Sequence, residues 1–410
     1  MDIVIIGNSA AAVGCIEGIR QSDKESSITV ISKEPYPTYS RPLISYLLYG
    51  KTTEQGMLYR PESFYRDNHV TFMAGKTVKA IHKDEKNVLL EDGSLIKYDK
   101  LLIATGSTPF IPPIQGLDTV PYQSTFLSLD DAKFIQAAVT PETRVLIMGA
   151  GLIGLKCAEG IQRLVKSITV VDLADRILPS ILDEQGSDLV KAHIEEHGIT
   201  FILSDSVTRF EENRAYLSSG RAVDFDLLVI AVGVRPNVEL AKDIGIHVGR
   251  GIQVDADGRT SQPDIYAAGD CTESFDITSG ERRVLALLPA AYMQGESAGI
   301  HMVGGEKPYD KAIPMNAIGF FGLHMITAGS YDGESYIESG TGTYKRLVTK
   351  DGLLKGYILI GDVARAGIYT AMIRNQVPLD TVDFDLLREK PQLMAFSRKD
   401  REEMLGREPK

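Results

Sequence analysis

Two glycine-rich turns are the first residues in this sequence whose types and spacing suggest chemistry. Residues 149–162 read GAGLIGLKCAEGIQ and place Gly149, Gly151 and Gly154 in a GxGxxG pattern after the apolar run RVLIM. Between a strand and a helix, these glycines permit a tight turn, close approach of the backbone to a pyrophosphate, and close helix–strand packing. The first N–H groups and the dipole of the helix then favour a phosphate. The pattern predicts a dinucleotide site, although GxGxxG alone also arises by chance.

An acidic residue lies where the strand after this turn should end. Asp172 follows Gly149 by 23 residues. A carboxylate at this place accepts hydrogen bonds from both ribose hydroxyls and repels a 2′-phosphate, which favours NADH over NADPH. Arg176 lies near enough in sequence to weaken that preference. The alternative is that Asp172 is an ordinary polar residue at a strand end.

The first turn is a degenerate copy of the second. Residues 7–20 read GNSAAAVGCIEGIR, with Ser9 and Ala12 in place of the second and third glycines. Both side chains are small enough to allow a close phosphate approach. Ser32 takes the place of the strand-end aspartate, and Glu34 follows two residues later. Glu34 is therefore the predicted ribose ligand of this first site.

The similarity of the two turns extends into an internal repeat. SITVIS at residues 27–32 matches SITVVD at 167–172, and IATG at 103–106 matches IAVG at 230–233. Each unit runs from a strand through a small turn and a helix to a second strand, which is a right-handed βαβ unit. We predict an α/β fold with two doubly wound, Rossmann-like dinucleotide-binding domains. Alternation in TYKRLVTK and LKGYILIG predicts half-buried strands in a C-terminal α+β domain.

Composition excludes several classes of function. The net charge of −11 argues against nucleic-acid binding, which needs a basic face. No apolar run reaches the length of a membrane span, and no basic leader precedes Ile3, so we expect a cytoplasmic protein. The three cysteines are Cys15, Cys157 and Cys271; they are too far apart in sequence for a CxxC motif or a zinc knuckle and too few for a cluster of four cysteine ligands. No metal site is expected.

Several further motifs carry a resemblance to a known family. Residues 260–270 read TSQPDIYAAGD, residues 39–42 read YSRP, and residues 288–291 read LPAA. With the two turns, these motifs resemble the pyridine nucleotide-disulfide oxidoreductase superfamily over roughly residues 1 to 375. The closest likeness is to rubredoxin and ferredoxin reductases, apoptosis-inducing factor and the flavin domain of NADH-dependent nitrite reductase.

The resemblance implies that the first domain binds FAD and the second binds NAD(H). Asp270 would accept a hydrogen bond from a ribityl hydroxyl, Arg41 would neutralise the pyrophosphate, and the backbone of Val78 would contact adenine. The helix that starts at LPAA would direct its positive end at the flavin and stabilise the reduced form. The expected FAD contacts are Gly7, Ser9, Ala10, Glu34, Arg41, Val78, Ala104, Thr105, Gly106, Gly269, Asp270, Leu288 and Ala290. The expected NAD contacts are Gly149, Gly151, Leu152, Ile153, Asp172 and Gly233.

The chain departs from the disulfide-reducing members of this family. The segment after Glu34 reads PYPTYSRPLISYLLYG and has no cysteine, so the nucleophile of disulfide chemistry is missing. The C-terminal His-Glu base is not apparent either, and His324 is expected in the core. Cys15 and Cys157 occupy equivalent helical positions, which predicts packing roles, and a structural role is also favoured for Cys271.

A second departure concerns charge near the flavin. Many relatives have a lysine near flavin N5, opposed by a glutamate on the NAD-binding helix; here Tyr46 and Lys156 occupy those two positions. We hypothesise that Lys156 points at the flavin–nicotinamide junction and stabilises reduced flavin. The alternative is a solvated helix lysine.

We expect four segments in three domains. They are an FAD-binding domain in two parts, 1–111 and 236–311, an NAD-binding domain at 112–235 and a C-terminal interface domain at 312–410. The last of these is expected to form a homodimer or complex interface. The charged tail from Phe396 is expected to be a solvated helix, with a docking peptide as the alternative.

These observations predict a flavoprotein that passes a hydride from NADH to FAD and then electrons to an acceptor protein. The acceptor is expected to be rubredoxin-like or an iron–sulfur partner. Two alternatives stay open: an NADH oxidase that uses oxygen, and a non-catalytic nucleotide-binding subunit of a larger redox complex.

Overall fold

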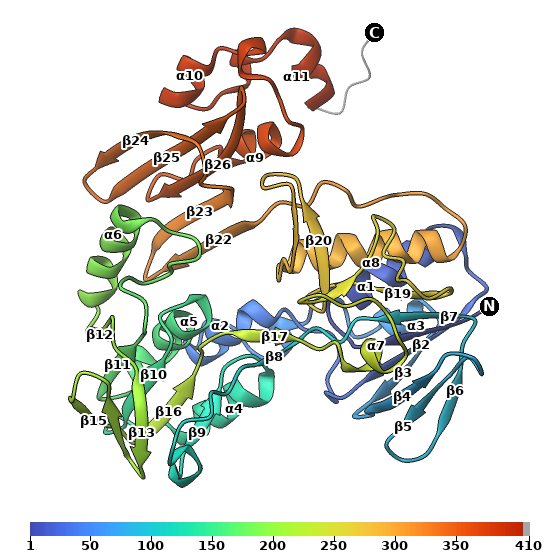
Figure 1. Cartoon of the computed structure of the whole chain (residues 1–410), viewed down its shortest axis with the longest axis horizontal. Coiled ribbons are helices and arrows are strands. Elements are labelled where there is room, and N and C mark those ends of the chain that lie inside the picture. Colours follow the sequence, from blue (N-terminus) through green and yellow to red (C-terminus); the bar gives the residue numbers. More distant parts are fainter. Residues whose placement is uncertain (405–410) are drawn as a thin grey trace. The chain divides into compact units, whose positions relative to one another are not determined.

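The computed structural model describes residues 1–404 and divides the chain into two compact units (Figure 1). The first unit comprises Met1–Asp175, Gly198–Phe275 and Arg282–Asp310. The second comprises Arg176–His197, Asp276–Glu281 and the chain from Lys311 onward. The division into four segments expected from the sequence stays a prediction.

Two parallel sheets form the framework of the first unit, as the repeat predicts. The first sheet has the strand order β19-β7-β1-β2-β3. Its strands are β1 (Asp2–Ile6), β2 (Ser27–Ser32), β3 (Val70–Ala74), β7 (Lys100–Ile103) and β19 (Ile265–Ala267). The second sheet has the order β12-β11-β10-β16-β9. Its strands are β9 (Gln123–Thr125), β10 (Arg144–Met148), β11 (Ser167–Val171), β12 (Ile199–Ile202) and β16 (Leu227–Ile230).

Smaller sheets complete the strands of this part of the chain. One three-stranded sheet is formed by β4 (Val78–His82), β5 (Asn87–Leu90) and β6 (Leu95–Lys97). Another is formed by β13 (Val207–Glu211), β14 (Arg214–Leu217) and β15 (Ala222–Asp224). A third small sheet contains β18 (Ile252–Gln253), β20 (Thr272–Asp276) and β21 (Glu281–Arg283). The strands β8 (Ser107–Pro109) and β17 (Val234–Pro236) pair antiparallel.

The β8–β17 pair joins the two repeats at the IATG and IAVG motifs. Each strand directly follows the glycine of its IATG or IAVG motif. The N–H of Phe110 donates to the carbonyl of Gly233 at 2.9 Å, and the N–H of Asn237 donates to that of Gly106 at 2.9 Å. The two chain crossings therefore run side by side as one two-stranded ribbon.

The two longest α-helices of the first unit follow the first glycine-rich turn and begin with the LPAA motif, with 13 and 15 residues. The α-helices are α1 (Ala10–Ser22), α2 (Ile44–Leu48), α3 (Phe64–Asp67), α4 (Leu129–Ala138), α5 (Leu152–Ile161), α7 (Glu239–Asp243) and α8 (Leu288–Met302). The 3₁₀ turns are η1 (Arg41–Leu43), η2 (Gln55–Met57), η3 (Leu117–Thr119) and η4 (Gln162–Leu164).

Helices α1 and α8, which Figure 1 draws side by side, pack against each other with glycines at their closest approach. A Cβ atom added at Gly295 would lie 1.9 Å from the carbonyl oxygen of Ala11, and one added at Gly14 would lie 2.1 Å from that of Tyr292. Only glycine permits such a close approach of two helix backbones. This packing ties the start of the chain to a helix almost 300 residues later.

The second unit is built on a five-stranded antiparallel sheet of order β22-β23-β26-β25-β24. Its strands are β22 (Met315–Phe320), β23 (Leu323–Gly329), β24 (Glu334–Gly340), β25 (Thr343–Lys350) and β26 (Leu353–Ile360). Its helices and turns are α6 (Glu184–Glu195), α9 (Ala366–Arg374), η5 (Leu379–Thr381), α10 (Phe384–Glu389), η6 (Leu393–Ala395) and α11 (Arg398–Met404). The expected α+β character is confirmed, and the two alternating segments are β25 and β26.

The core of the second unit contains two fully buried tyrosines whose hydroxyls are satisfied. Tyr357 shares a hydrogen bond of 2.7 Å with Thr370, and Tyr369 donates to the carbonyl of Leu387 at 2.5 Å. The expectation that His324 belongs to the core is wrong. Side chains alternate along β23, so Met325 points into the core and His324 is exposed.

The charged tail expected to be helical begins as expected. Helix α11 spans Arg398–Met404, and the remainder of the tail lies outside the described residues. Among the residues that the structure describes, no helix has the length and apolar character that a membrane span needs.

Candidate functional site

The first glycine-rich turn connects β1 to α1 against the end of β7. Gly7 has φ +110°, and a Cβ atom there would lie 2.1 Å from the carbonyl oxygen of Ala104. Helix α1 begins at Ala10 with Ser9 as its N-cap, and no side chain in the described chain caps it. The structure thus brings Gly7, Ser9, Ala10 and Ala104 together at a helix N-terminus whose N–H groups face no capping side chain.

Asn8, inside this turn, was not singled out from the sequence. Its Oδ1 accepts hydrogen bonds from the hydroxyls of Thr38 at 2.7 Å and Tyr65 at 2.8 Å. Its Nδ2 donates to the carbonyl of Tyr36 at 3.2 Å. Three hydrogen bonds of the Asn8 side chain therefore fix the conformation of the turn. The only sign of them in the sequence is the position of an asparagine between two small residues.

The strand-end carboxylate of the first repeat is held by two neighbours. Glu34 pairs with Arg41 at 2.5 Å through Oε1 and accepts the Tyr39 hydroxyl at 2.6 Å through Oε2. A carboxylate has about four lone-pair positions, so both oxygens can still accept a ribose hydroxyl. Glu34 and Arg41 are thus brought together, and Tyr39 is the partner that orients them.

The motif at residues 260–270 returns to the same place through β19, which pairs with β7. Gly269 has φ +87°, and its neighbours Ala11 and Ala291 place it between the starts of α1 and α8. The N–H of Gly269 donates to Oε1 of Gln294 at 2.6 Å, an anchor on α8 that sequence reasoning missed. Burial raises the pKa of the Asp270 carboxyl, and the charge of Arg41 opposes this shift.

Helix α8 starts at Leu288 with proline in its first turn, as predicted, and Leu288 packs on the core cluster that contains Ala10 and Ala104. Ala290 is buried in the same turn. Val78 lies apart from the start of α8, at the first residue of β4. There it packs on another core cluster, which contains residues of β1 and β7. Thr105 donates to the carbonyl of Asn237 at 2.8 Å and so lies at the two-stranded ribbon with Gly106.

The second glycine-rich turn repeats the geometry of the first. Gly149 also has φ +110°, and a Cβ atom there would lie 2.3 Å from the carbonyl oxygen of Ala231. Gly151 caps α5 without a side chain, and the space beside its Cα is open. Leu152 and Ile153 form the first helical residues, both half-buried. Gly233, at φ +115°, follows Ala231 in the same junction.

Asp172 turns toward this second turn. Its Oδ2 accepts the N–H of Ala150 at 2.6 Å, and its Oδ1 accepts the N–H of Ala174 at 2.8 Å. The carboxylate therefore links the end of β11 to the turn itself. These bonds suit both an ordinary strand-end turn residue and a ribose ligand, so the assignment of Asp172 to the ribose stays a prediction.

Lys156 faces α2, and the solvated alternative is wrong. Its side chain is 15% exposed, it forms an ion pair with Glu159, and its Nζ lies 5.0 Å from the ring centre of Tyr46. The two positions that depart from the family pattern are therefore in contact. Glu159 was not identified from the sequence, because its role depends on a buried neighbour.

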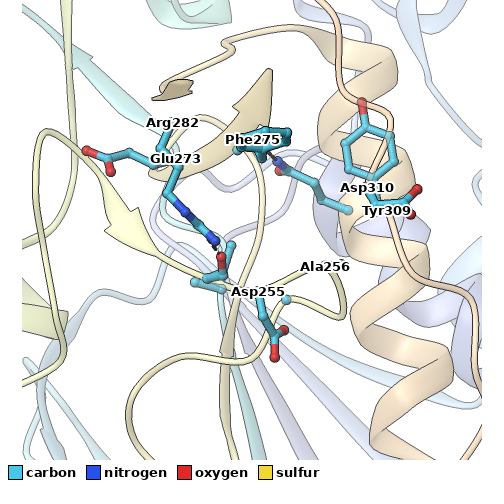
Figure 2. A pocket seen from close by; sticks show the side chains of 12 residues that line it. Asp255, Ala256, Glu273, Phe275, Arg282, Tyr309 and Asp310 are labelled. Carbon is cyan, nitrogen blue, oxygen red and sulfur yellow. Dashed lines mark hydrogen bonds between the residues drawn. The ribbon is translucent and has the colours of Figure 1, made fainter. Parts of the chain in front are cut away.

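A cavity of about 120 Å³ lies beside Gln294, away from both turns (Figure 2). Asp255, Glu273, Arg282 and Tyr309 are among the residues that line it. Arg282 donates to the carbonyl of Val254 at 2.6 Å, and Glu273 accepts the N–H of Gly251 at 3.0 Å. Its lining in the described chain contains none of the predicted cofactor residues.

The geometry of the two turns fits two dinucleotides. Each has a glycine at positive φ against a strand-end carbonyl, an uncapped helix N-terminus, and a carboxylate at the end of the next strand or just beyond it. Phosphates suit the uncapped N–H groups, and ribose hydroxyls suit the carboxylates.

Comparisons with known proteins agree with this arrangement. The sequence pattern described as "Pyridine nucleotide-disulphide oxidoreductase" matches residues 1–295. The epsilon subunit of NADH-dependent phenylglyoxylate dehydrogenase from Aromatoleum evansii is 31% identical over 389 residues, which cover 92% of each chain. The assimilatory nitrate reductase electron transfer subunit of Bacillus subtilis (strain 168) is 31% identical over 88% of this chain, which spans 47% of that relative.

A solved structure shows the same fold. The covalent putidaredoxin reductase–putidaredoxin complex matches with a TM-score of 0.88 at 23% identity, over 95% of this chain and 96% of that one. The chain therefore belongs to the pyridine nucleotide-disulphide oxidoreductase family and is an NAD(P)H-dependent oxidoreductase that binds FAD and NAD(H).

Proposed function

We propose that this chain takes a hydride from NADH and delivers the electrons, through FAD, to a protein electron carrier such as a rubredoxin or an iron–sulfur partner subunit. The names of two relatives support this proposal. One is a subunit of an NADH-dependent dehydrogenase, and the other is an electron transfer subunit. The expected homodimer or complex interface in the C-terminal domain stays a prediction.

The burial of every cysteine is the observation that carries the proposal. Cys15, Cys157 and Cys271 are all free and buried. Burial raises the pKa of the Cys271 thiol to about 11 and raises the pKa of the thiols of Cys15 and Cys157 as well. Thiols with raised pKa contain little thiolate, which is the reactive form. This supports an electron exit directly from the flavin, without a redox disulfide.

The protein's own part in this reaction is to bind and to orient. Bound FAD supplies both the hydride acceptor and the electron donor. The turns at Gly7 and Gly149 would hold the two pyrophosphates, while Glu34 and Asp172 would hold the riboses. Asn8 and Gln294 keep the first turn and Gly269 in place. These contacts would set the position of the nicotinamide relative to the flavin, on which the rate of hydride transfer depends.

Lys156 would supply an electrostatic contribution. It lies one helical turn into α5, beyond the predicted pyrophosphate contact, and it is held between Glu159 and Tyr46. A fixed cation in a partly buried place stabilises negative charge that develops on a nearby ring. This would favour reduced flavin.

The test uses the purified protein with FAD bound, under anaerobic conditions. NADH should bleach the flavin absorbance rapidly, and oxidised rubredoxin or a [2Fe–2S] ferredoxin should restore it. Fast NADH consumption in air without a carrier would indicate the oxidase alternative instead. If NADH failed to bleach the flavin, the proposed hydride transfer would be wrong.

A further inference from the structure

A group of aromatic and basic side chains lies on the surface formed by α2 and η4. The basic tyrosine patch consists of Tyr46, Tyr49, Lys51 and Arg163. The Nζ of Lys51 lies 4.4 Å from the ring centre of Tyr49 and 5.8 Å from that of Tyr46. The Cζ of Arg163 lies 4.8 Å from the ring centre of Tyr49. Two segments more than a hundred residues apart thus share one surface.

Helices α2 and α5 pack closely beneath the basic tyrosine patch. A Cβ atom added at Gly160 of α5 would lie 3.0 Å from the carbonyl oxygen of Ser45 and 3.1 Å from Cβ of Leu48. Helices α2 and α5 are therefore in direct contact below the tyrosines. The positions of the two cations relative to the rings follow from this packing.

The charges of the patch are not neutralised by carboxylates. In the part of the chain that the structure describes, neither Lys51 nor Arg163 has a carboxylate oxygen within 4 Å, whereas nearby Lys133 pairs with Glu54 at 2.8 Å. Stacking a cation on a tyrosine contributes about 0.5–1 kcal/mol at an exposed site and leaves its charge available to a partner. Lys51 and Arg163 are both exposed, and Tyr46 is 40% exposed.

This surface contrasts with the charge of the whole chain. A net charge of −11 repels an acidic protein from most of the molecule. The cations of the basic tyrosine patch would attract an acidic protein to this part of the surface and would favour one orientation of it. Tyrosine and arginine are also the residue types that most often carry binding energy at protein interfaces.

The patch lies next to the proposed redox site. Tyr46 contacts the Nζ of Lys156, the residue proposed to face the flavin–nicotinamide junction. We infer that the basic tyrosine patch is the docking surface for an acidic one-electron carrier protein. This inference rests on the proposed function. Oxidation of one NADH releases two electrons and one proton, so two oxidised carrier molecules are reduced in succession at this surface.

The experiment reverses the charge of the patch in the FAD-loaded protein. The variant K51E/R163E is compared with K79E/K97E, which makes the same change in charge on exposed positions of β4 and β6. The probes are an acidic rubredoxin and an acidic [2Fe–2S] ferredoxin, each at low and high ionic strength. The rate of flavin bleaching by NADH is measured in parallel, because neither pair of residues belongs to the proposed cofactor site.

The patch variant should raise the KM for the carrier by about tenfold or more at low salt, with kcat and flavin bleaching unchanged. The difference should shrink at high salt, since the Debye length falls to about 3 Å at 1 M. K51Q/R163Q should give an intermediate KM, and the control should stay within about twofold of the parent.

Equal KM values for the patch variant and the control would overturn the docking surface while leaving the proposed function intact. If the parent protein reduced neither carrier, although NADH bleached its flavin, the proposed function and the docking inference would both fail. Loss of a dimer in the patch variant, seen by sedimentation, would assign the surface to a second copy of this chain and would also overturn the inference.

Discussion

The two glycine-rich turns have the same backbone but are held in place by different means. Asn8 in the first turn stands where Ala150 stands in the second. Side-chain bonds from Asn8 to Thr38 and Tyr65 fix the first turn, whereas the N–H of Ala150 is held by the carboxylate of Asp172. If the first site holds FAD as proposed, these bonds would hold its turn without the predicted ribose ligand Glu34, which would suit a cofactor that stays bound. In the second turn Asp172, the predicted ribose ligand, also holds the turn, so NADH binding and turn geometry would be coupled there, which would suit a nucleotide that must leave.

The largest effects are expected from matched changes at the first glycine of each turn. In G7A and G149A the new Cβ atom would meet a carbonyl oxygen at 2.1 Å and 2.3 Å, at a φ that alanine rarely adopts. We expect G7A to be purified without FAD. G149A should retain FAD and need roughly a hundredfold more NADH for bleaching, since strained backbone costs about 1–3 kcal/mol.

Flavin absorbance per protein and NADH titration measure these two outcomes. The control is G93A, which also has positive φ but nothing within 4 Å of the new Cβ atom. Loss of FAD in G149A with its retention in G7A would reverse the assignment of the two sites.

The second prediction concerns the coupling of Asp172 to its turn. D172N keeps one acceptor but loses the charge, so the KM for NADH should rise roughly tenfold or more, because a hydrogen bond to a charged group contributes about 1.5–3 kcal/mol. The KM for NADPH should rise less, because a 2′-phosphate is no longer repelled. S32A, at the equivalent position in the first repeat, serves as the control. An unchanged ratio of the two KM values would show that Asp172 does not select the nucleotide.

The third prediction tests whether the first turn is formed before FAD binds. N8A makes the first turn resemble the second at this position and removes the acceptor of two hydroxyls. The Kd for FAD should rise by about fivefold, from the net loss of about 1 kcal/mol of hydrogen bonding. The KM for NADH should stay constant. Fluorescence titration of the FAD-free protein measures the Kd, and an unchanged value would remove Asn8 from the explanation.

The sequence was informative wherever the structure is local or repeated. Both turns, the strands before and after them, and the start of α8 follow from short sequence motifs, and the structure confirms them. The supporting contacts could not be predicted in this way. Gln294 bonds Gly269 across 25 residues, and Tyr65 reaches Asn8 across 57 residues. Such contacts depend on how elements far apart in the sequence pack against one another. Local sequence patterns do not determine that packing.

The smallest effect is expected at Lys156, whose equivalent in the first repeat is the uncharged Gly14. K156M keeps most of the side-chain length while removing the charge that Glu159 and Tyr46 hold in place. Flavin reduction by NADH should slow about three- to fivefold in stopped-flow measurements, as expected for roughly 1 kcal/mol of electrostatic stabilisation. The reduction potential of the bound flavin should become more negative, a change that loss of packing alone would not cause. K166M changes an exposed lysine directly before β11 and should leave both quantities unchanged. If K156M behaved like K166M, the cation of α5 would have no part in hydride transfer, and only the two turns would distinguish the nucleotide sites.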